Sequence, residues 1–331
     1  MSGTAVAVDR HAYLTEAPLQ PGDRVHFVTP SGLGDAESLQ RAVGYYREWG
    51  LEVTVGEHVL QPHPRAKYLA GPDAGRRTDL VDAWLDPDTA AVVCVRGGYG
   101  AMRLLDGIDW DLMRGAALRR DGRPKLLTGS SDITALHEAF RVQMDVPTLF
   151  CPMPGNDVFR DSEAIRDDVR RWLFEPWGDR GIVGPEAEVM VPGRAAGRFT
   201  GGNLALLAGA LGAPEAAVAP GGILFLEDID EELYRLDGFL LALLRAGRIA
   251  AASGIVLGSW HNCAVRDGTA DLDGVRALMS EYLADLGKPV LWEQGFGHDP
   301  NALSVPLNVD GVLEAGDAGI RLVVGEVGGE A

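Results

Sequence analysis

The sequence predicts an α/β protein with two domains, a parallel-sheet α/β domain in the first half and a smaller mixed α/β domain in the second. The chain has 331 residues, more than a single hydrophobic core usually fills. In the first half, short apolar runs alternate with helix-like segments, which favours a parallel sheet covered on both faces. Small residues follow several of these runs, at the strand ends where α/β proteins usually carry their functional groups.

The elements of the first half follow from apolar runs and their flanking turns. Pro21-Gly22-Asp23 is typical of a turn and precedes the first run. The patterns predict strands at 25–28, 51–55, 90–95 and 125–128, and helices at 36–49, 78–85 and after residue 132.

The composition changes across residues 171–195, which are rich in Trp, Pro and Gly. We therefore expect an N-terminal arm at 1–20, an α/β domain at 21–170, a linker at 171–195 and a C-terminal domain at 196–331. Within the last of these, the patterns predict strands at 222–226, 255–257 and 290–292 and a helix at 233–244.

Composition excludes several classes of partner. The net charge is −18, a field that repels nucleic acid and anionic lipid surfaces. The first twenty residues carry charges and no apolar core, and no apolar run is long enough to span a membrane. Only three cysteines occur, far apart, so we expect neither a disulfide framework nor a zinc site. These features predict a cytoplasmic protein.

A serine follows the predicted strand at 125–128. In the run from Lys125 to Leu136, the small residues at 129 and 130 would allow a sharp turn that exposes the hydroxyl of Ser131 beside a helix N-terminus. A nucleophile in this position could use nearby N–H groups to stabilise an oxyanion. A helix N-cap is the competing interpretation. Ile133 replaces the second glycine of G-x-S-x-G, so this is not the α/β-hydrolase elbow.

Three other segments could carry chemistry. Glycines at 97, 98 and 100 follow a strand. They would let the backbone lie close to a ligand, or they would form only a tight turn. Glu227 and Asp228 end an apolar strand, where they could serve catalysis or the start of the next helix. His298 follows a glycine turn. The pair His261 and Cys263 lacks the partners that a metal site needs.

Taken together, these segments resemble the LD-carboxypeptidase family of serine peptidases, which also includes microcin-immunity peptidases. The resemblance runs from about Pro21 to Leu307. It rests on the order and spacing of the motifs Pro-Gly-Asp-Arg at 21–24, Tyr-Leu-Ala-Gly at 68–71, Arg-Gly-Gly-Tyr-Gly at 96–100, Gly-Ser-Ser-Asp at 129–132, Gly-Gly-Asn-Leu at 201–204, Leu-Glu-Asp at 226–228 and Gly-His at 297–298.

The resemblance implies a glutaminase-like N-terminal domain that carries the nucleophile Ser131, and a C-terminal domain that supplies Glu227 and His298. It also implies a homodimer without a cofactor or metal. In the resulting mechanism, the backbone N–H groups of Gly98 and Asp132 would form the oxyanion hole. The chain departs from the family at Ser130 (commonly tyrosine), at Phe150-Cys151 (usually His-Gly) and at Gly238 (commonly arginine).

The implied substrate is a small peptide or peptide conjugate. An LD-carboxypeptidase would release a terminal D-amino acid from a cell-wall peptide, and Arg96 is the candidate for binding its carboxylate, with Tyr99 and Asn203 as further substrate contacts. A structural salt bridge is the alternative role for Arg96.

Three other functions stay open at this point. A microcin-immunity-type peptidase would cleave an aminoacyl-nucleotide or peptide-nucleotide antibiotic and would need an aromatic platform such as Trp172 or Trp177. A non-catalytic binding protein could use the same scaffold. A glutaminase would use Cys94, which lies inside an apolar strand, where cysteines usually pack.

Overall fold

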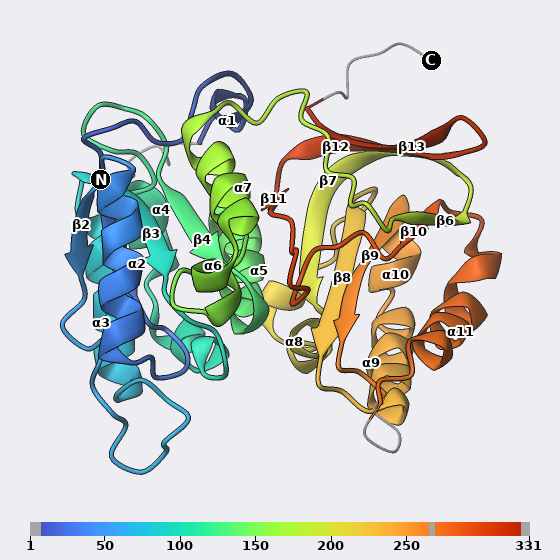
Figure 1. Ribbon diagram of the computed structural model, residues 1–331, viewed down its shortest axis with the longest axis horizontal. Helices are drawn as coiled ribbons and strands as arrows, with labels where there is room; N and C mark the ends of the chain where they lie inside the picture. Colours follow the sequence, from blue (N-terminus) through green and yellow to red (C-terminus); the bar gives the residue numbers. More distant parts are fainter. Residues whose placement is uncertain (1–7, 265–268, 326–331) are drawn as a thin grey trace. The chain divides into compact units, whose positions relative to one another are not determined.

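The protein consists of two compact α/β units, as the computed structural model in Figure 1 shows. The structure describes residues 8–264 and 269–325. The first unit ends at Trp177 and the second begins at Gly178. The predicted fold class, two mixed α/β parts with a parallel sheet in the first, is confirmed.

The sheet of the first unit has its strands in the order β5-β4-β3-β1-β2, all parallel. Every residue of β3 is buried, as expected for a central strand covered on both faces. Because the strands are all parallel, their carboxyl ends meet at one edge of the sheet. The strands are β1 (Arg24–Val28), β2 (Glu52–Val55), β3 (Thr89–Cys94), β4 (Leu126–Gly129) and β5 (Thr148–Phe150).

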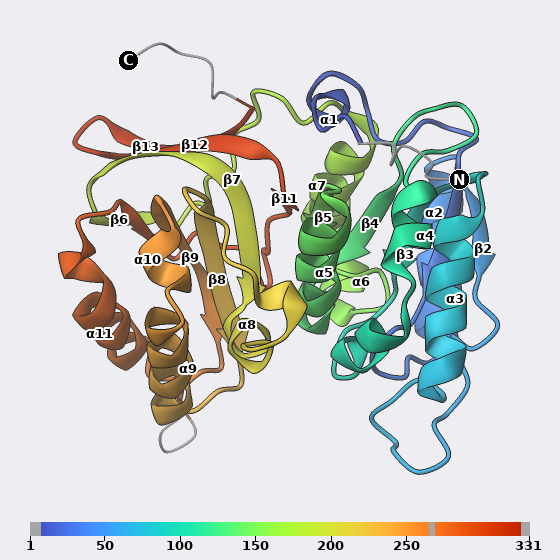
Figure 2. The same cartoon turned by 180° about the vertical axis from the view of Figure 1, so that it is seen from behind.

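Helices cover both faces of this sheet, with α2 on one face and α3 on the other (Figures 1 and 2). Tyr46 of α2 packs on Phe159 of α6, and Trp84 of α3 packs on Phe140 of α5. The helices are α1 (His11–Thr15), α2 (Ala36–Glu48), α3 (Asp73–Leu85), α4 (Trp110–Gly115), α5 (Thr134–Met144), α6 (Asp157–Asp161) and α7 (Glu163–Phe174), with 3-10 turns η1 (Ala101–Gly107) and η2 (Ser131–Ile133).

Residues 8–20, the described part of the predicted N-terminal arm, pack against the first unit; residues 1–7 of the predicted arm lie outside the described residues. Tyr13, in α1, is buried, stacks on Trp177 with 4.9 Å between ring centroids, and donates a hydrogen bond of 2.5 Å to the carbonyl of Lys125. Helix α7 continues to Phe174, inside the predicted linker, and both Trp172 and Trp177 are buried. The tryptophans in the stretch predicted as a linker instead belong to the hydrophobic core of the first unit.

The second unit contains a mixed sheet in the order β13-β12-β7-β8-β9-β10-β6. The four strands β7, β8, β9 and β10 are parallel, and β6, β12 and β13 pair antiparallel with their neighbours. The strands of this sheet are β6 (Glu188–Val191), β7 (Gly193–Asn203), β8 (Ile223–Ile229), β9 (Gly254–His261), β10 (Val290–Trp292), β12 (Asp310–Gly316) and β13 (Gly319–Val324). A further strand, β11 (Val305–Leu307), lies outside this sheet.

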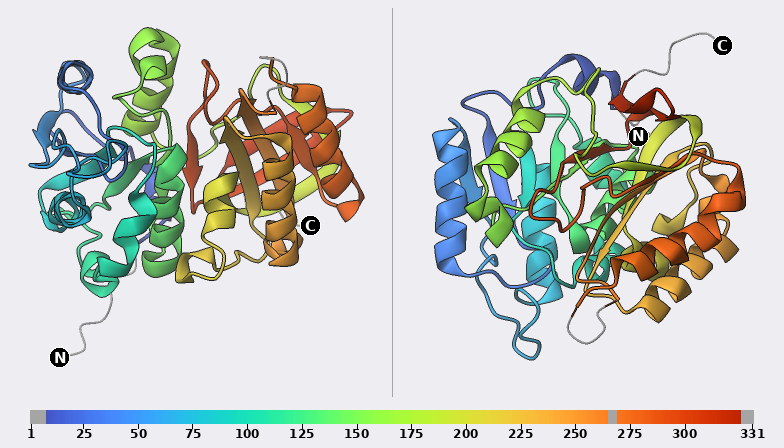
Figure 3. Two further views of the ribbon diagram at one scale, coloured as in Figure 1. Left: turned by 90° about the horizontal axis from the view of Figure 1, so that it is seen from below. Right: turned by 45° about the vertical axis from the view of Figure 1, so that its right-hand side comes forward.

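Helices α9 and α11 lie side by side along this second sheet (Figure 3). They pack on Leu224 and Leu226 of β8, which belong to the same apolar core. Because side chains alternate along a strand, Glu227 points to the other face, with Phe225. The helices are α8 (Leu204–Gly209), α9 (Leu233–Arg245), α10 (Arg248–Ala251) and α11 (Leu272–Leu283), with 3-10 turns η3 (Pro214–Ala216) and η4 (Ala284–Leu286).

Within residues 8–264 and 269–325, every helix is too short or too polar to cross a lipid bilayer.

Candidate active site

Ser131 lies at the turn between β4 and α5 and has a backbone φ of 60°. The left-handed region is unfavourable for serine, so the surrounding structure must hold this conformation, as it does at many functional turns. Gly129 ends β4, and a Cβ at that position would lie 2.9 Å from Ile133 and 3.0 Å from Cys94. The turn is therefore tight, as the small residues at 129 and 130 predict.

The side chain of Ser131 caps no helix. The residues that precede η2 and α5 are Ser130 and Ile133, and neither makes a side-chain capping hydrogen bond. The N-cap interpretation of this segment is therefore wrong. The half-buried Ser131 side chain remains a candidate nucleophile.

The glycine turn after β3 approaches Ser131 closely. A Cβ built on Gly97 would lie 3.1 Å from Ser131 Cβ and 3.0 Å from Met153 Cε, both tighter than ordinary contacts, so glycine suits this close approach. Gly98 follows with a φ of 111°. Among the described residues, neither the Gly98 N–H nor the Asp132 N–H donates to another group, which leaves both able to bind an oxyanion.

Asp132 has a buried carboxylate beside the turn. Its Oδ2 accepts hydrogen bonds from Ser31 Oγ at 2.5 Å and from the Ala101 N–H at 2.8 Å. Burial raises the pKa of Asp132 above its usual value, although the donors Ser31 and Ala101 and the charge of Arg76 oppose the rise. This side chain therefore serves the internal structure of the first unit.

Arg96 and Tyr99 are exposed on the same turn. Among the residues that the structure describes, Arg96 has no carboxylate partner within 4.0 Å, which removes the support for a structural salt bridge. Tyr99 is 52% exposed and meets Tyr68 edge to face, with 5.8 Å between ring centroids. A free guanidinium and an exposed ring can both contact a ligand.

Glu227 and His298 form a hydrogen-bonded pair in the second unit. The distance from His298 Nδ1 to Glu227 Oε2 is 2.7 Å, and the glutamate side chain is 0% exposed. Gly297 permits this contact, because a Cβ there would lie 2.5 Å from Glu227 Oε2. The other oxygen, Glu227 Oε1, is buried and accepts no hydrogen bond from the described residues. The carboxylate is therefore directed at the imidazole.

A β-bulge lies opposite Glu227. Leu226 pairs with Leu257 and Asp228 with Trp260, so β9 has one residue more than β8 over this stretch. The bulge contains Ser259, whose Oγ accepts a 3.1 Å hydrogen bond from the His298 N–H. Bulges often turn a side chain toward a functional site. Here the bulge fixes the backbone of His298, a role that the sequence did not reveal because Ser259 belongs to no recognisable motif.

The electrostatics of the pair favour a charged imidazole. Burial alone would lower the pKa of His298, but the negative charge and hydrogen bond of Glu227, with a contribution from Asp228, raise it above its usual value. Burial and the neighbouring Glu227 raise the pKa of Asp228 to about 7. The site thus holds two adjacent carboxyls with different environments.

Asn203 is buried at the start of α8. Its Oδ1 accepts from the Leu206 N–H at 3.1 Å and its Nδ2 donates to Asp228 Oδ1 at 2.8 Å. These contacts make Asn203 a structural residue that caps α8 and holds the second carboxyl. A substrate contact through this side chain stays a prediction.

Other sequence candidates fit no catalytic role. Cys94 is fully buried, and burial raises its pKa far above the ordinary thiol value, so the glutaminase interpretation lacks a thiolate. His261 is exposed while Cys263 is buried. Across residues 8–264 and 269–325, no three His, Cys, Asp or Glu side chains are grouped to hold a metal ion.

Comparison with known proteins identifies the family. Residues 25–151 match the LD-carboxypeptidase N-terminal domain and residues 196–313 match the C-terminal domain. The chain is 43% identical to a putative carboxypeptidase of Streptomyces coelicolor, covering 90% of this chain and 93% of that protein. It is 33% identical to a probable murein peptide carboxypeptidase of Bacillus subtilis, covering 90% and 91%.

A solved structure, the MccF-like protein of Bacillus anthracis, has the same fold, with a TM-score of 0.80 over 94% of this chain and 98% of that one at 21% identity. These matches cover nearly the whole sequence. The chain belongs to the LD-carboxypeptidase family and is a serine-type carboxypeptidase.

Proposed function

We propose that Ser131, His298 and Glu227 act together to hydrolyse an amide bond. The observation that carries this proposal is the 2.7 Å contact between Glu227 and His298, which orients an imidazole as a general base. The strained turn at Ser131, beside two unpaired N–H groups, supplies a suitable nucleophile in the first unit. The family supports the pairing, since its members are serine peptidases.

In the proposed mechanism, Glu227 accepts the Nδ1–H of His298, which leaves Nε2 free to accept a proton. Nε2 takes the proton of Ser131 Oγ as the oxygen attacks the scissile carbonyl. The N–H groups of Gly98 and Asp132 bind the resulting oxyanion, and one such donor is worth about 2.7–4 kcal/mol of barrier. The proton then passes to the leaving amine, and water hydrolyses the acyl-enzyme through the same base.

Replacing Ser131 tests the assignment. Ser131→Ala should reduce kcat at least about 10³-fold, because the nucleophile is lost while the oxyanion donors remain. Release of the terminal amino acid is measured by mass spectrometry, and circular dichroism confirms the fold. Ser130→Ala is the matched control, since Ser130 is buried one residue earlier and has no proposed part in the chemistry. Turnover retained by Ser131→Ala would refute the nucleophile.

We further propose that the substrate is a cell-wall peptide that loses a terminal D-amino acid. The support is the murein peptide carboxypeptidase of Bacillus subtilis, at 33% identity over most of both chains. Such a peptide ends in a carboxylate, and the exposed Arg96 guanidinium lies one residue before the glycine that approaches Ser131.

The role of Arg96 is tested by Arg96→Lys. Loss of a bidentate contact should raise KM about tenfold with little change in kcat, because the carboxylate is bound equally in the ground and transition states. Initial rates with an L,D-tetrapeptide provide both constants. Arg65→Lys, at another exposed arginine, is the control. An unaltered KM in Arg96→Lys would mean that another group binds the carboxylate.

An aminoacyl-nucleotide or peptide-nucleotide substrate is the second candidate, because the chain shares its fold with the MccF-like protein. Trp172 and Trp177 give it no support, since both are buried in the first unit and present no ring face to a ligand. Hydrolysis of an L,D-tetrapeptide compared with that of an aminoacyl-sulfamoyl nucleoside separates the two substrates.

We also propose that the protein works in the cytoplasm, as its composition predicts, and that it is a homodimer, as the family resemblance implies. Sedimentation equilibrium, which measures molar mass, and fractionation of cells test these two points.

A further inference from the structure

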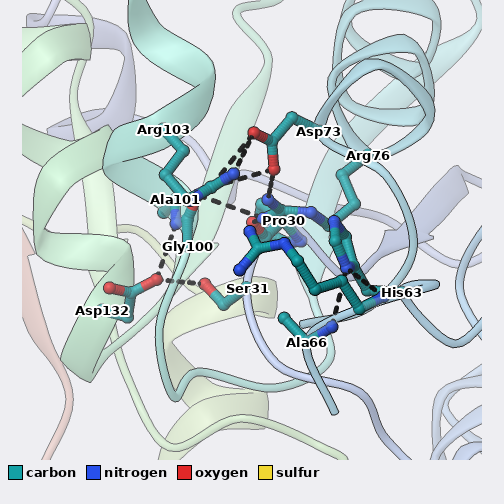
Figure 4. A network of polar contacts seen from close by, with 11 residues as sticks. Pro30, Ser31, His63, Ala66, Asp73, Arg76, Gly100, Ala101, Arg103 and Asp132 are labelled. Atoms are coloured by element: carbon teal, nitrogen blue, oxygen red, sulfur yellow. Dashed lines mark hydrogen bonds and ion pairs between the residues drawn. The ribbon is translucent and has the colours of Figure 1, made fainter. Parts of the chain in front are cut away.

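The Asp132 carboxylate connects the nucleophile turn to two other loops of the first unit (Figure 4). Asp132 and Ser31 are both buried, and the carboxylate accepts from Ser31 Oγ at 2.5 Å and from the Ala101 N–H at 2.8 Å. Ser31 belongs to the loop after β1 and Ala101 ends the glycine turn after β3. A charged group is costly to bury and is kept where its hydrogen bonds hold a geometry.

The two loops also contact one another beside the predicted oxyanion donor. The Gly32 N–H donates to the Gly97 carbonyl at 3.0 Å, one residue before Gly98. A Cβ on Gly32 would lie 2.8 Å from that carbonyl oxygen, so the approach leaves no spare room. Any displacement of Ser31 would therefore move the Gly97–Gly98 peptide relative to Ser131.

A buried arginine also links the same two loops. The Arg76 guanidinium donates to the carbonyls of Pro30 and Gly100 and pairs with Asp73, which also binds Arg103 (Figure 4). Arg76 thus joins the β1 loop to the far end of the glycine turn. Asp132 is the connection between this assembly and the nucleophile turn itself.

We propose that Asp132 is a positioning residue, which holds the Gly97–Gly98 peptide at the distance from Ser131 that oxyanion binding requires. This inference rests on the proposed function, in which Gly98 donates to the oxyanion. The Asp132 carboxylate acts only through Ser31 and Ala101, whereas the backbone N–H of the same residue is one of the two proposed oxyanion donors. Its effect should appear in the transition state and leave ground-state binding nearly unchanged.

Substitution of Asp132 should separate these effects. In Asp132→Ala, kcat should fall about 100-fold, the cost of a misplaced oxyanion donor, while KM changes less than about threefold. Asp132→Asn keeps an oxygen that can accept both hydrogen bonds and should recover kcat to within about tenfold of the wild type. Asp132→Ala should also lose about 100-fold in affinity for a peptide aldehyde, which forms an oxyanion, and keep its affinity for the peptide product.

Asp79→Ala is the matched control. Asp79 is also a buried aspartate that holds a loop, through the backbone N–H and Nδ1 of His58, both at 2.8 Å. It should lose thermal stability yet keep kcat within about threefold of the wild type. If Asp132→Ala does not fold, Ser31→Ala removes one of the hydrogen-bond donors to Asp132 and should lower kcat about tenfold at constant KM.

The outcomes distinguish the two proposals. Full kcat in Asp132→Ala or Ser31→Ala, with Ser131→Ala inactive, would overturn the positioning role alone. Equal losses of aldehyde and product affinity would also overturn it. Activity retained by Ser131→Ala would instead overturn the proposed function.

Discussion

His298 has a pKa set by opposing effects. Its burial favours the neutral ring, whereas Glu227 at 2.7 Å favours the charged ring and prevails, so the pKa lies above its ordinary value. A general base must be neutral before it can accept a proton. Activity is therefore expected to rise with pH through this raised pKa, and at pH 6.5 most of the enzyme should still hold the proton.

Glu227→Gln should move this pH dependence. The glutamine removes the negative charge and leaves the burial, so the midpoint of the acid limb of kcat/KM should shift to lower pH. The maximal rate should fall about 10³-fold, because the charged imidazole loses its stabilising partner. Initial rates between about pH 5 and pH 9 measure both effects.

Asp230→Asn is the matched control for that series. Asp230 also raises the pKa of His298 but is exposed, so solvent screens its charge and the midpoint should hardly move. Equal midpoints in Glu227→Gln and the wild type would show that another group titrates in the acid limb.

At the scale of elements, strands and turns place the reactive groups. Ser131, after the end of β4, has a left-handed conformation. The β9 bulge places Ser259 where its Oγ accepts a hydrogen bond from the His298 N–H. The turn that carries His298 passes so close to β8 that residue 297 has no room for a side chain. Each element therefore depends on a local departure from regular geometry.

Gly297→Ala should disrupt this arrangement. The new Cβ would lie 2.5 Å from Glu227 Oε2 and the backbone φ is 113°, so both the contact and the conformation are unfavourable. We expect a loss of about 2–3 kcal/mol in the free energy of unfolding and at least a tenfold fall in kcat. Urea denaturation and initial rates provide the two measurements.

Gly287→Ala is the control for backbone strain. Gly287 also has a positive φ, 67°, but nothing lies within 4 Å of a Cβ there. It should lose only about 1 kcal/mol and keep its kcat. Equal effects of the two alanines on kcat would show that the approach to Glu227 is unimportant.

At the scale of the whole molecule, net charge opposes the proposed substrate. The chain carries a charge of −18, and a cell-wall peptide ends in a carboxylate. Long-range repulsion should slow their encounter, while the exposed Arg96 attracts the carboxylate at short range. Salt screens the long-range part more strongly than a close contact.

Raising the ionic strength from about 0.02 M to about 0.3 M should therefore increase kcat/KM by about twofold. The measurement uses an L,D-tetrapeptide at fixed pH. Arg96→Gln removes the short-range attraction and should show at least as large an increase. A decrease with salt in the wild type would mean that a local positive field dominates the approach of the substrate.

From its short-range patterns and motif order, the sequence predicts the alternation of strands and helices, the glycine turns and the family. It placed Ser131 after one predicted strand, Glu227 at the end of another and His298 after a glycine turn, and β4 and β8 overlap the two predicted strands. It did not indicate that Trp172 and Trp177 are core residues, since their Pro- and Gly-rich surroundings are typical of a linker.

Which groups contact one another follows from the folding of distant segments onto each other. The contact between Glu227 and His298 joins residues 71 positions apart, and that between Ser31 and Asp132 joins residues 101 apart. Asn203 shows the same dependence, because its role follows from its bonds to Leu206 and Asp228. Such contacts arise from the packing of whole strands and loops, and no local pattern in the chain encodes their distances.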